Sequence, residues 1–308
     1  MRNTFANEVT ALAREDPRII LLSGDIGNKL FDDFKEIAPD RFYNCGVAEA
    51  NMTGVAAGLA MMGFRSITYT ITPFATVRCL EQIRVDVCYH NVSVIIVGTG
   101  AGLSYASLGP THHSCDDIGF LRTIPNLTIL CPCDTIEVRA ALRAAVNRGG
   151  PTYLRLGKKG EPTIHLKNPD FQIGKAITVK YGTDCCILST GNIMPVALTV
   201  AKILEEKNIS TRIESFHTVK PLDLLKLTEL FDQYSLIVTL EEHNLIGGLG
   251  SAVAEWITSQ EKVMGKLLRF GTRDEFLPFV GEQEYARHYY GLDSQAITVE
   301  ILKRLTRT

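Results

Sequence analysis

The sequence predicts an α/β protein of two domains, each with a largely parallel β-sheet covered by helices. The chain has 308 residues, and at roughly 100–200 residues per domain this length is enough for two cores. Short apolar runs alternate with helical patterns, as in parallel sheets that are buried on both faces. This alternation breaks between residues 150 and 182, where glycines, prolines and lysines gather, and then starts again.

The predicted first domain covers residues 1–165 and contains four strands with helices between them. Apolar positions recur at helical spacing, which predicts helices at 4–15, about 48–62, 75–88 and 134–148. Apolar runs rich in β-branched residues predict strands at 19–23, 66–70, 92–97 and 127–130. The helix at 48–62 is built mostly of small residues, which indicates close packing against another subunit or a cofactor.

A linker is expected to run to about residue 182, and a second, smaller domain covers 183–308. Its strands are expected at 186–190, 211–216 and 236–240, and its helices at 194–207 and about 249–259. Ligands of open parallel sheets bind beyond the carboxyl ends of the strands. The candidate site therefore lies in the first-domain loops at 23–30, 43–49, 70–78 and 98–117.

The composition argues against several classes of partner. A formal net charge of −2 gives no reason to expect a nucleic acid or an anionic membrane. The apolar runs are shorter than the ~20 residues that span a bilayer, and the N-terminus lacks the core of a secretion signal, so we expect a cytoplasmic protein. The eight cysteines are expected to be reduced thiols. Neither close pair of cysteines has zinc-ligand spacing, and we expect no metal ligand on this chain.

A carboxylate stands where a loop enters the small-residue helix, in the run Gly46-Val47-Ala48-Glu49. Taken alone, Glu49 is typical of a helix-start glutamate that the helix dipole favours. Further motifs follow it in a fixed order and favour a functional role. They are Phe74 with Arg78 and Glu81-Gln82-Ile83-Arg84, Gly109-Pro110-Thr111-His112, Ile124-Pro125-Asn126-Leu127-Thr128, Tyr153-Leu154-Arg155, Lys220-Pro221-Leu222-Asp223, and Glu241-Glu242-His243 before Gly247-Gly248-Leu249-Gly250.

This ordered set resembles the pyrimidine-binding and C-terminal domains of transketolase and 1-deoxyxylulose-5-phosphate synthase. More distantly, it is similar to the β subunits of 2-oxoacid dehydrogenases. The resemblance covers essentially the whole chain and implies a parallel-sheet pyrimidine-binding domain followed by a smaller α/β C-terminal domain. It also implies thiamine diphosphate as the cofactor. A glutamate of that family hydrogen-bonds a ring nitrogen of the cofactor's pyrimidine, and Glu49 matches this position as a catalytic and cofactor-binding residue.

The resemblance also implies a partner chain. The family holds the diphosphate through Mg²⁺, which is bound by a Gly-Asp-Gly motif and a later asparagine in a separate pyrophosphate-binding domain. This chain has no such domain, because its superficially similar Gly24-Asp25-Ile26-Gly27 lies before the glutamate. We therefore expect an α subunit to supply the metal ligands. The chain is then the β subunit of a split transketolase in an α2β2 assembly, with each cofactor between subunits.

Further site residues carry over from the same resemblance. His112 matches a catalytic histidine that contacts the hydroxyls of the donor ketose, and His113 follows it as a substrate candidate. Asp25 matches the acidic residue near the thiazolium ring. Phe74 is the candidate aromatic side chain for the pyrimidine, and Ile71 lines the same pocket. The aromatic residues of transketolases fall at positions occupied here by Thr72, Ala75 and Arg78.

The substrate positions depart from the transketolase pattern. The aspartate that precedes Gly-Pro-Thr-His and reads the acceptor hydroxyl is replaced by Leu108, and a substrate-phosphate histidine by Gly100. The cationic character of the mouth survives, with substrate candidates Lys29, Arg78, Lys158 and Lys159. An anionic sugar is the expected substrate, and Leu108 favours a modified or deoxygenated sugar phosphate.

Three functions stay open at this point. The first is transfer of a two-carbon ketol unit from a ketose to an aldose, which Gly-Pro-Thr-His favours. The second is a decarboxylating enzyme that condenses pyruvate with an aldehyde or feeds a lipoyl carrier. The third is a non-catalytic assembly subunit, and the presence of Glu49 and His112 argues against it.

Overall fold

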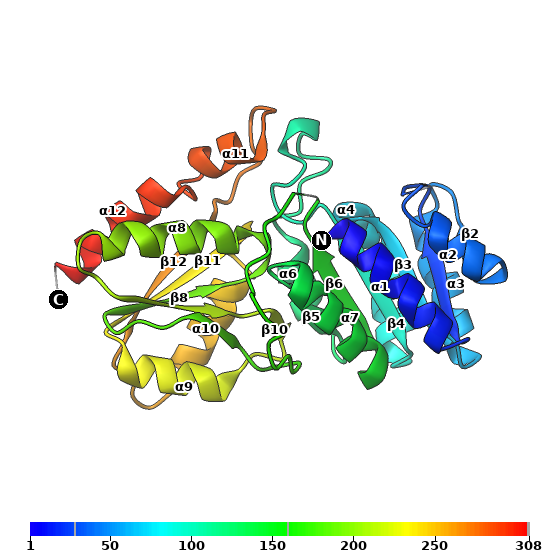
Figure 1. Cartoon of the computed structure of the whole chain (residues 1–308), viewed down its shortest axis with the longest axis horizontal. Helices are drawn as coiled ribbons and strands as arrows, with labels where there is room; N and C mark the ends of the chain where they lie inside the picture. Colours follow the sequence, from blue (N-terminus) through cyan, green and yellow to red (C-terminus); the bar gives the residue numbers. More distant parts are fainter. Residues whose placement is uncertain (28, 159, 307–308) are drawn as a thin grey trace.

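Two β-sheets organise the computed structural model of the chain, which describes residues 1–27, 29–158 and 160–306 (Figure 1). The first sheet has the strand order β10-β5-β6-β4-β3-β1-β2. Neighbouring strands are parallel, except that β10 pairs antiparallel with β5. Its strands are β1 Ile19–Ser23, β2 Phe42–Asn44, β3 Arg65–Ile71, β4 Val94–Thr99, β5 Thr128–Leu130, β6 Thr152–Leu156 and β10 Thr218–Lys220.

Helices cover both faces of this first sheet. The helices are α1 Arg2–Glu15, α2 Asp32–Ile37, α3 Glu49–Met61, α4 Thr72–Ala75, α5 Leu80–Gln82, α6 Asp117–Arg122 and α7 Thr135–Arg148. Side chains of β1 alternate between two cores: Ile19 and Leu21 pack toward α1 and α7, whereas Ile20 packs toward α3. This alternation follows from the two-residue repeat of a strand. The predicted parallel sheet buried on both faces is confirmed.

The single helix expected at 75–88 is wrong. The chain there forms α4, a 3₁₀ turn at Val77–Cys79, α5 and a π-helix at Ile83–Tyr89. The hydroxyl of Thr76 donates a hydrogen bond of 2.7 Å to the carbonyl oxygen of Thr72, which is the acceptor that a regular helix would offer to an amide. The interruption separates Phe74 from Arg78 and gives their side chains different orientations from those of a straight helix.

The second sheet has the strand order β12-β11-β8-β9-β7, with β7 antiparallel to β9 and the other neighbours parallel. Its strands are β7 Ile177–Lys180, β8 Cys185–Ser189, β9 Thr211–Ser215, β11 Leu236–Asn244 and β12 Lys266–Thr272. Its helices are α8 Met194–Glu205, α9 Leu224–Gln233, α10 Leu249–Thr258, α11 Gln283–Tyr289 and α12 Ser294–Leu305. α8 and α12 share one core and α9 and α10 the other.

The stretch 150–182, expected to be irregular, contains two strands. β6 is a central strand of the first sheet, and Tyr153 and Leu154 on it are fully buried. β7 belongs to the second sheet although it precedes residue 183, and β10 joins the first sheet although it follows that residue. Glycines and prolines flank these strands and mask their apolar pattern. The domain boundaries at 165 and 183 stay a prediction.

A buried polar network joins the two domains behind the loop that carries His112. The guanidinium of Arg155 on β6 donates to Asp117 at 2.7 Å, and also to the carbonyl oxygens of Ser114 and Glu242. The carboxylate of Glu242 on β11 in turn accepts the main-chain N–H of Leu103 at 3.0 Å. Both domains therefore fix the course of residues 101–117.

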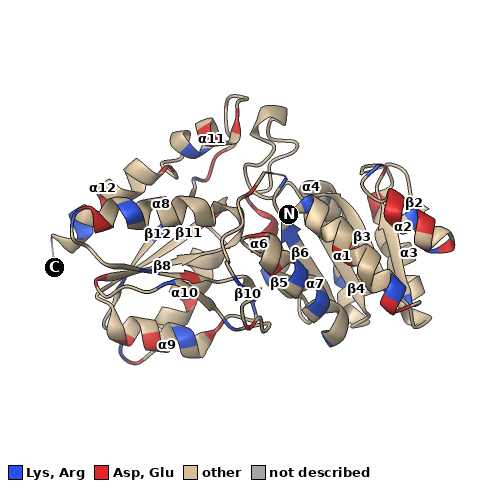
Figure 2. Ribbon diagram, in the orientation of Figure 1, with Lys and Arg blue, Asp and Glu red and all other residues tan. Residues whose placement is uncertain are grey.

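Two further features bear on the partners of the protein. Basic and acidic residues alternate along the helices of both domains, in keeping with the formal net charge of −2 (Figure 2). Among the described residues, no helix is both long and apolar enough to cross a membrane.

Candidate active site

Glu49 is the first residue of α3, at the carboxyl end of the first sheet. Its side chain is buried, with 1% of its surface exposed, and one carboxylate oxygen lies 2.7 Å from Nη1 of Arg78. Gly24 follows β1 and lies against it: a β-carbon there would come within 3.2 Å of Cγ of Glu49. The loop after β1 therefore needs a glycine to let the glutamate enter the site.

Arg78 lies over this carboxylate and remains partly open to solvent. Its side chain is 42% exposed, and its guanidinium carbon lies 4.2 Å from the ring centre of Phe74. A buried carboxylate without a counter-ion is costly. Arg78 supplies the counter-ion from the solvent side, where a ligand with an N–H donor is able to replace it.

Phe74 connects this ion pair to the histidine loop. Its ring lies 5.3 Å from the ring of His112 in an edge-on arrangement. The ring of His112 is 6.3 Å from that of Tyr105, and the ammonium of Lys158 lies 4.7 Å from the centre of the Tyr105 ring. The structure thus links Glu49, through Arg78, Phe74 and Tyr105, with His112 and Lys158.

Tyr105 is the site residue that the sequence analysis missed. A β-carbon on Gly100 would overlap the Tyr105 ring, and Gly100 has a positive φ of 81°. The aromatic ring therefore occupies the space beside the position where transketolases carry a substrate-phosphate histidine. The available signal was an aromatic residue within a loop that has three glycines in alternate positions, Gly98, Gly100 and Gly102.

Asp25 and Lys29 lie on the loop after β1. The carboxylate of Asp25, which has a positive φ of 57°, accepts a hydrogen bond of 2.9 Å from the side-chain amide of Asn44. Asn44 also accepts the main-chain N–H of Gly46, so this contact shapes the approach to α3. Lys29 is exposed. No hydrogen bond or ion pair between described residues joins either side chain to Glu49.

The other predicted residues occupy different positions. Ile71 ends β3 and is half-buried. His113 turns away from His112: it lies 3.5 Å from the carbonyl oxygen of Ala106 and lines a separate cavity with Cys115, Asp116 and Tyr290. Burial lowers the pKa of His113. Lys159 lies outside the described residues.

The glycine run at 247–250 has a structural partner. The carboxylate of Glu241 accepts the N–H groups of Leu249 and Gly250, both at 2.7 Å, at the start of α10. Burial raises the pKa of Glu241, although these two N–H donors oppose the shift. The first amides of α10 are therefore already satisfied by the protein itself.

Comparison with known proteins places both halves of the chain. Residues 1–162 match the pyrimidine binding domain of transketolase and residues 174–297 its C-terminal domain. One of the two subunits of an apulose-4-phosphate transketolase, from Phocaeicola vulgatus, is 34% identical over 299 residues, which cover 96% of this chain and 94% of that protein. A 1-deoxy-D-xylulose-5-phosphate synthase of Syntrophus aciditrophicus is 33% identical, and the chain spans only 46% of its length.

A solved structure described as a split gene transketolase, in the form of an inactive beta4 tetramer, superposes on this chain. The TM-score is 0.90 with 33% identity, and the match covers 99% of this chain and 98% of the other.

Proposed function

The chain belongs to the transketolase family as a subunit of the split type, and we propose that Glu49 is the catalytic carboxylate with which it activates thiamine diphosphate. The observation that carries the proposal is the state of Glu49. This carboxylate is buried, and its guanidinium partner, Arg78, is reachable from solvent. Such an acceptor strongly favours a ligand that brings a protonated ring nitrogen, because a charge-assisted hydrogen bond strengthens in a dry site.

The residues around Glu49 fit the pyrimidine half of the cofactor. Phe74 offers an aromatic ring beside the carboxylate, and half-buried Ile71 offers an apolar side chain. The hydroxyl of Thr70, near Gly24, is buried and has no hydrogen-bond partner among the described residues. Asp25 extends the polar lining on the next loop. When bound, the cofactor supplies a nucleophilic carbon that attacks carbonyl groups and takes up the electrons of a cleaved carbon–carbon bond.

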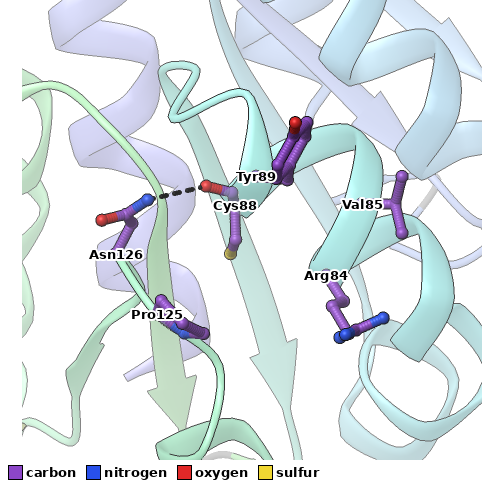
Figure 3. A pocket seen from close by; sticks show the side chains of 6 residues that line it. All are labelled: Arg84, Val85, Cys88, Tyr89, Pro125 and Asn126. Atoms are coloured by element: carbon purple, nitrogen blue, oxygen red, sulfur yellow. Dashed lines mark hydrogen bonds between the residues drawn. The ribbon is translucent and has the colours of Figure 1, made fainter.

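We propose that the diphosphate and its Mg²⁺ are held by an α subunit in an α2β2 assembly. An exposed apolar surface lies beside Glu49 and consists of Val47, Val55, Val77, Val85 and Tyr89. It spans α3 and the 3₁₀ and π-helical segments that contact α3. Tyr89 is 79% exposed and lines a cavity with Val85 and Pro125, in which Asn126 bonds to Cys88 (Figure 3). Large exposed apolar surfaces of this kind mark interfaces.

Assembly can be tested apart from catalysis. Val55→Asp and Tyr89→Asp should prevent co-elution with the α subunit in size-exclusion chromatography, because each places a charge in the apolar surface. Leu225→Asp, at an exposed leucine of α9, is the matched control and should co-elute normally. Co-elution of both surface variants at wild-type affinity would contradict the assignment of this surface.

For the reaction, we propose transfer of a two-carbon ketol unit from an anionic ketose to an aldose. His112 lies beside Phe74 and so next to the proposed pyrimidine site, where its imidazole can hydrogen-bond a donor hydroxyl and hold a proton. Lys158, Arg78 and Lys29 supply positive charge for a phosphate, and His113 stays a substrate candidate on the far side of the loop.

The departures at two positions bear on the sugar. Leu108 is 51% exposed, and the Tyr105 ring fills the space beside Gly100. An apolar side chain and a ring replace two hydroxyl- and phosphate-reading groups, so we propose a modified or deoxygenated sugar phosphate as substrate. The relative named for apulose 4-phosphate is consistent with such a sugar.

The reaction is tested by mixing the chain with its α subunit, thiamine diphosphate and Mg²⁺, and then supplying donors in parallel. Ketose phosphates should yield a shortened aldose without release of CO₂. Turnover of pyruvate with release of CO₂ would favour a decarboxylating enzyme instead. Rates with ordinary pentose phosphates as high as with deoxygenated ones would overturn the proposal about the sugar.

A further inference from the structure

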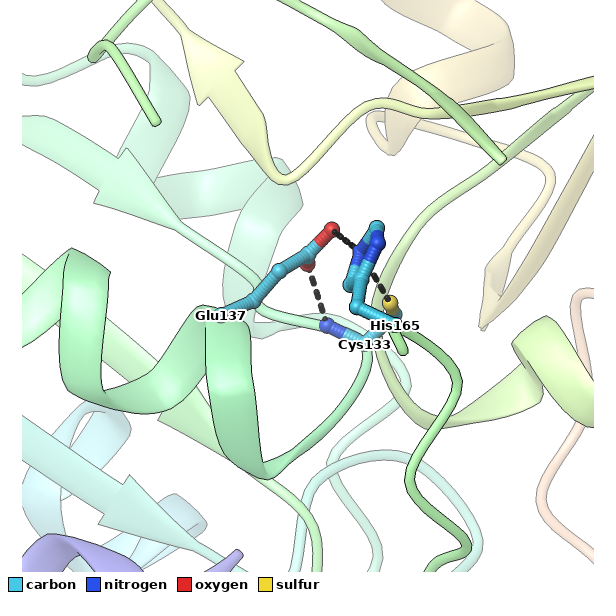
Figure 4. A group of neighbouring side chains, drawn as sticks. All are labelled: Cys133, Glu137 and His165. Carbon is cyan, nitrogen blue, oxygen red and sulfur yellow. Dashed lines mark hydrogen bonds and ion pairs between the residues drawn. The ribbon is translucent and has the colours of Figure 1, made fainter. Parts of the chain in front are cut away.

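Three side chains with metal-binding atoms converge near the junction of the two domains, away from Glu49. Cys133 lies in the turn after β5, Glu137 in the first turn of α7, and His165 in the segment between β6 and β7 (Figure 4). Sγ of Cys133 is 3.9 Å from Nε2 of His165, and this nitrogen is 2.9 Å from Oε1 of Glu137. The three ligand atoms all lie within 4.8 Å of one another.

Neighbouring hydrogen bonds hold these atoms in place. Oε2 of Glu137 accepts the main-chain N–H of Cys133 at 2.7 Å, which leaves Oε1 directed at His165. Asp134 caps α7 by accepting the N–H of Glu137 at 2.8 Å. Its other oxygen accepts the N–H groups of Ile164 and His165, at 2.8 and 2.9 Å. Contacts of this kind orient metal ligands before the metal arrives.

The cluster is enclosed and can become anionic. Cys133 and Glu137 are fully buried, and the side chain of His165 is 9% exposed, which leaves one way in for a small ion. Burial and the charge of Glu137 raise the pKa of Cys133. In the absence of a metal, the cluster therefore holds a neutral thiol beside a buried carboxylate that is hydrogen-bonded to His165.

We propose that Cys133, Glu137 and His165 bind one Zn²⁺ ion, with water as the fourth ligand. Sulfur, imidazole nitrogen and carboxylate oxygen are the donors that Zn²⁺ prefers, usually in tetrahedral geometry. Typical bond lengths in such a site separate sulfur and nitrogen by about 3.6 Å, close to the separation in the cluster. On binding, the thiol of Cys133 loses its proton to solvent, and His165 keeps its remaining proton on Nδ1.

The site has a structural consequence and lies outside the proposed catalytic machinery. Cys133 and Glu137 belong to the first domain, whereas His165 belongs to the segment that leads into the second sheet. Zn²⁺ would therefore fasten this segment to the turn after β5. Because the metal binds the folded chain, saturating Zn²⁺ should raise the melting temperature of the protein.

The test uses the full-length chain, reduced and freed of metal with a chelator. Titration with Co²⁺ should give one ion per chain, a sulfur-to-cobalt absorption band in the near ultraviolet, and displacement by Zn²⁺. His165→Gln should lower the affinity at least about tenfold, while Cys133→Ser should abolish the sulfur band. His90→Gln and Cys45→Ser alter a histidine and a cysteine outside the cluster, and both should bind as the wild type does.

His165 lies on a connecting segment, so His165→Gln keeps the proposal testable even where Cys133→Ser fails to fold. Circular dichroism in the presence of chelator checks that each variant is folded. The proposal is overturned if one equivalent of Co²⁺ produces no sulfur band. It is equally overturned if folded His165→Gln binds Co²⁺ and Zn²⁺ with wild-type affinity.

Discussion

Replacement of Arg78 by alanine leaves the carboxylate of Glu49 without the guanidinium that now lies 2.7 Å away. Removing one partner of a fully buried pair costs about 3–5 kcal/mol. Arg78 is 42% exposed, so water can reach the carboxylate in the variant, and the expected loss falls to about 1–2 kcal/mol. The lost contact with the face of Phe74 adds about 0.5 kcal/mol.

The matched changes separate charge from packing. Glu49→Gln keeps an oxygen that can accept from Arg78, so the cofactor-free chain should lose less than about 1 kcal/mol. In the double variant, the buried carboxylate is absent, and about 1 kcal/mol of the loss in Arg78→Ala should return. The coupling of Glu49 and Arg78 thus predicts non-additive effects.

The measurement is thermal unfolding of the four proteins without cofactor, at equal chain concentrations. At about 2–4 °C per kcal/mol, Arg78→Ala should melt several degrees below the wild type. The double variant should melt above Arg78→Ala. Equal melting temperatures of Arg78→Ala and the wild type would refute the ion-pair account, as would a double variant no more stable than Arg78→Ala.

Three further variants test the framework of the site. Burial opposes ionisation of Asp117, but Arg155 lowers its pKa below 3.8, so this stabilisation is present above pH ~4 and is lost as the pH falls through the lowered pKa. Asp117→Asn should flatten that part of a urea-unfolding series taken against pH. Gly100→Ala should cost about 2 kcal/mol or more in chemical unfolding, and Tyr105→Ala in the same chain should relieve the steric part but not the backbone strain. Glu241→Ala removes the acceptor of two amides of α10 and should cost about 1–2 kcal/mol, whereas an unchanged unfolding midpoint would contradict this capping role.

Much of the fold could be predicted because its signals are local. Strand β1 has the predicted bounds, Ile19–Ser23, and α3 begins at Glu49, within one residue of its predicted start. The broken helix after Thr72 was not predictable from periodicity, because its cause is a hydroxyl that competes for a carbonyl oxygen. Strand β6 was hidden by the glycines and prolines around it.

The candidate site shows the same division. Glu49, Phe74 and His112 are brought together as predicted residues of one loop edge, because parallel strands place their following loops on the same side. The ion pair of Glu49 with Arg78 joins residues 29 positions apart and depends on the broken helix. The cluster of Cys133 with His165 depends on Asp134, which fixes a distant segment by two main-chain hydrogen bonds. Neither contact has a spacing that sequence reading recognises.

The role of Glu49 is tested most directly by the exchange of the thiazolium C2 proton of thiamine diphosphate with deuterium from solvent. The wild-type chain, assembled with its α subunit and Mg²⁺, should accelerate this exchange over the free cofactor. Glu49→Gln should bind the cofactor but exchange about 10²–10⁴-fold more slowly than the wild type. Exchange in the Glu49→Gln complex at the wild-type rate would contradict the account.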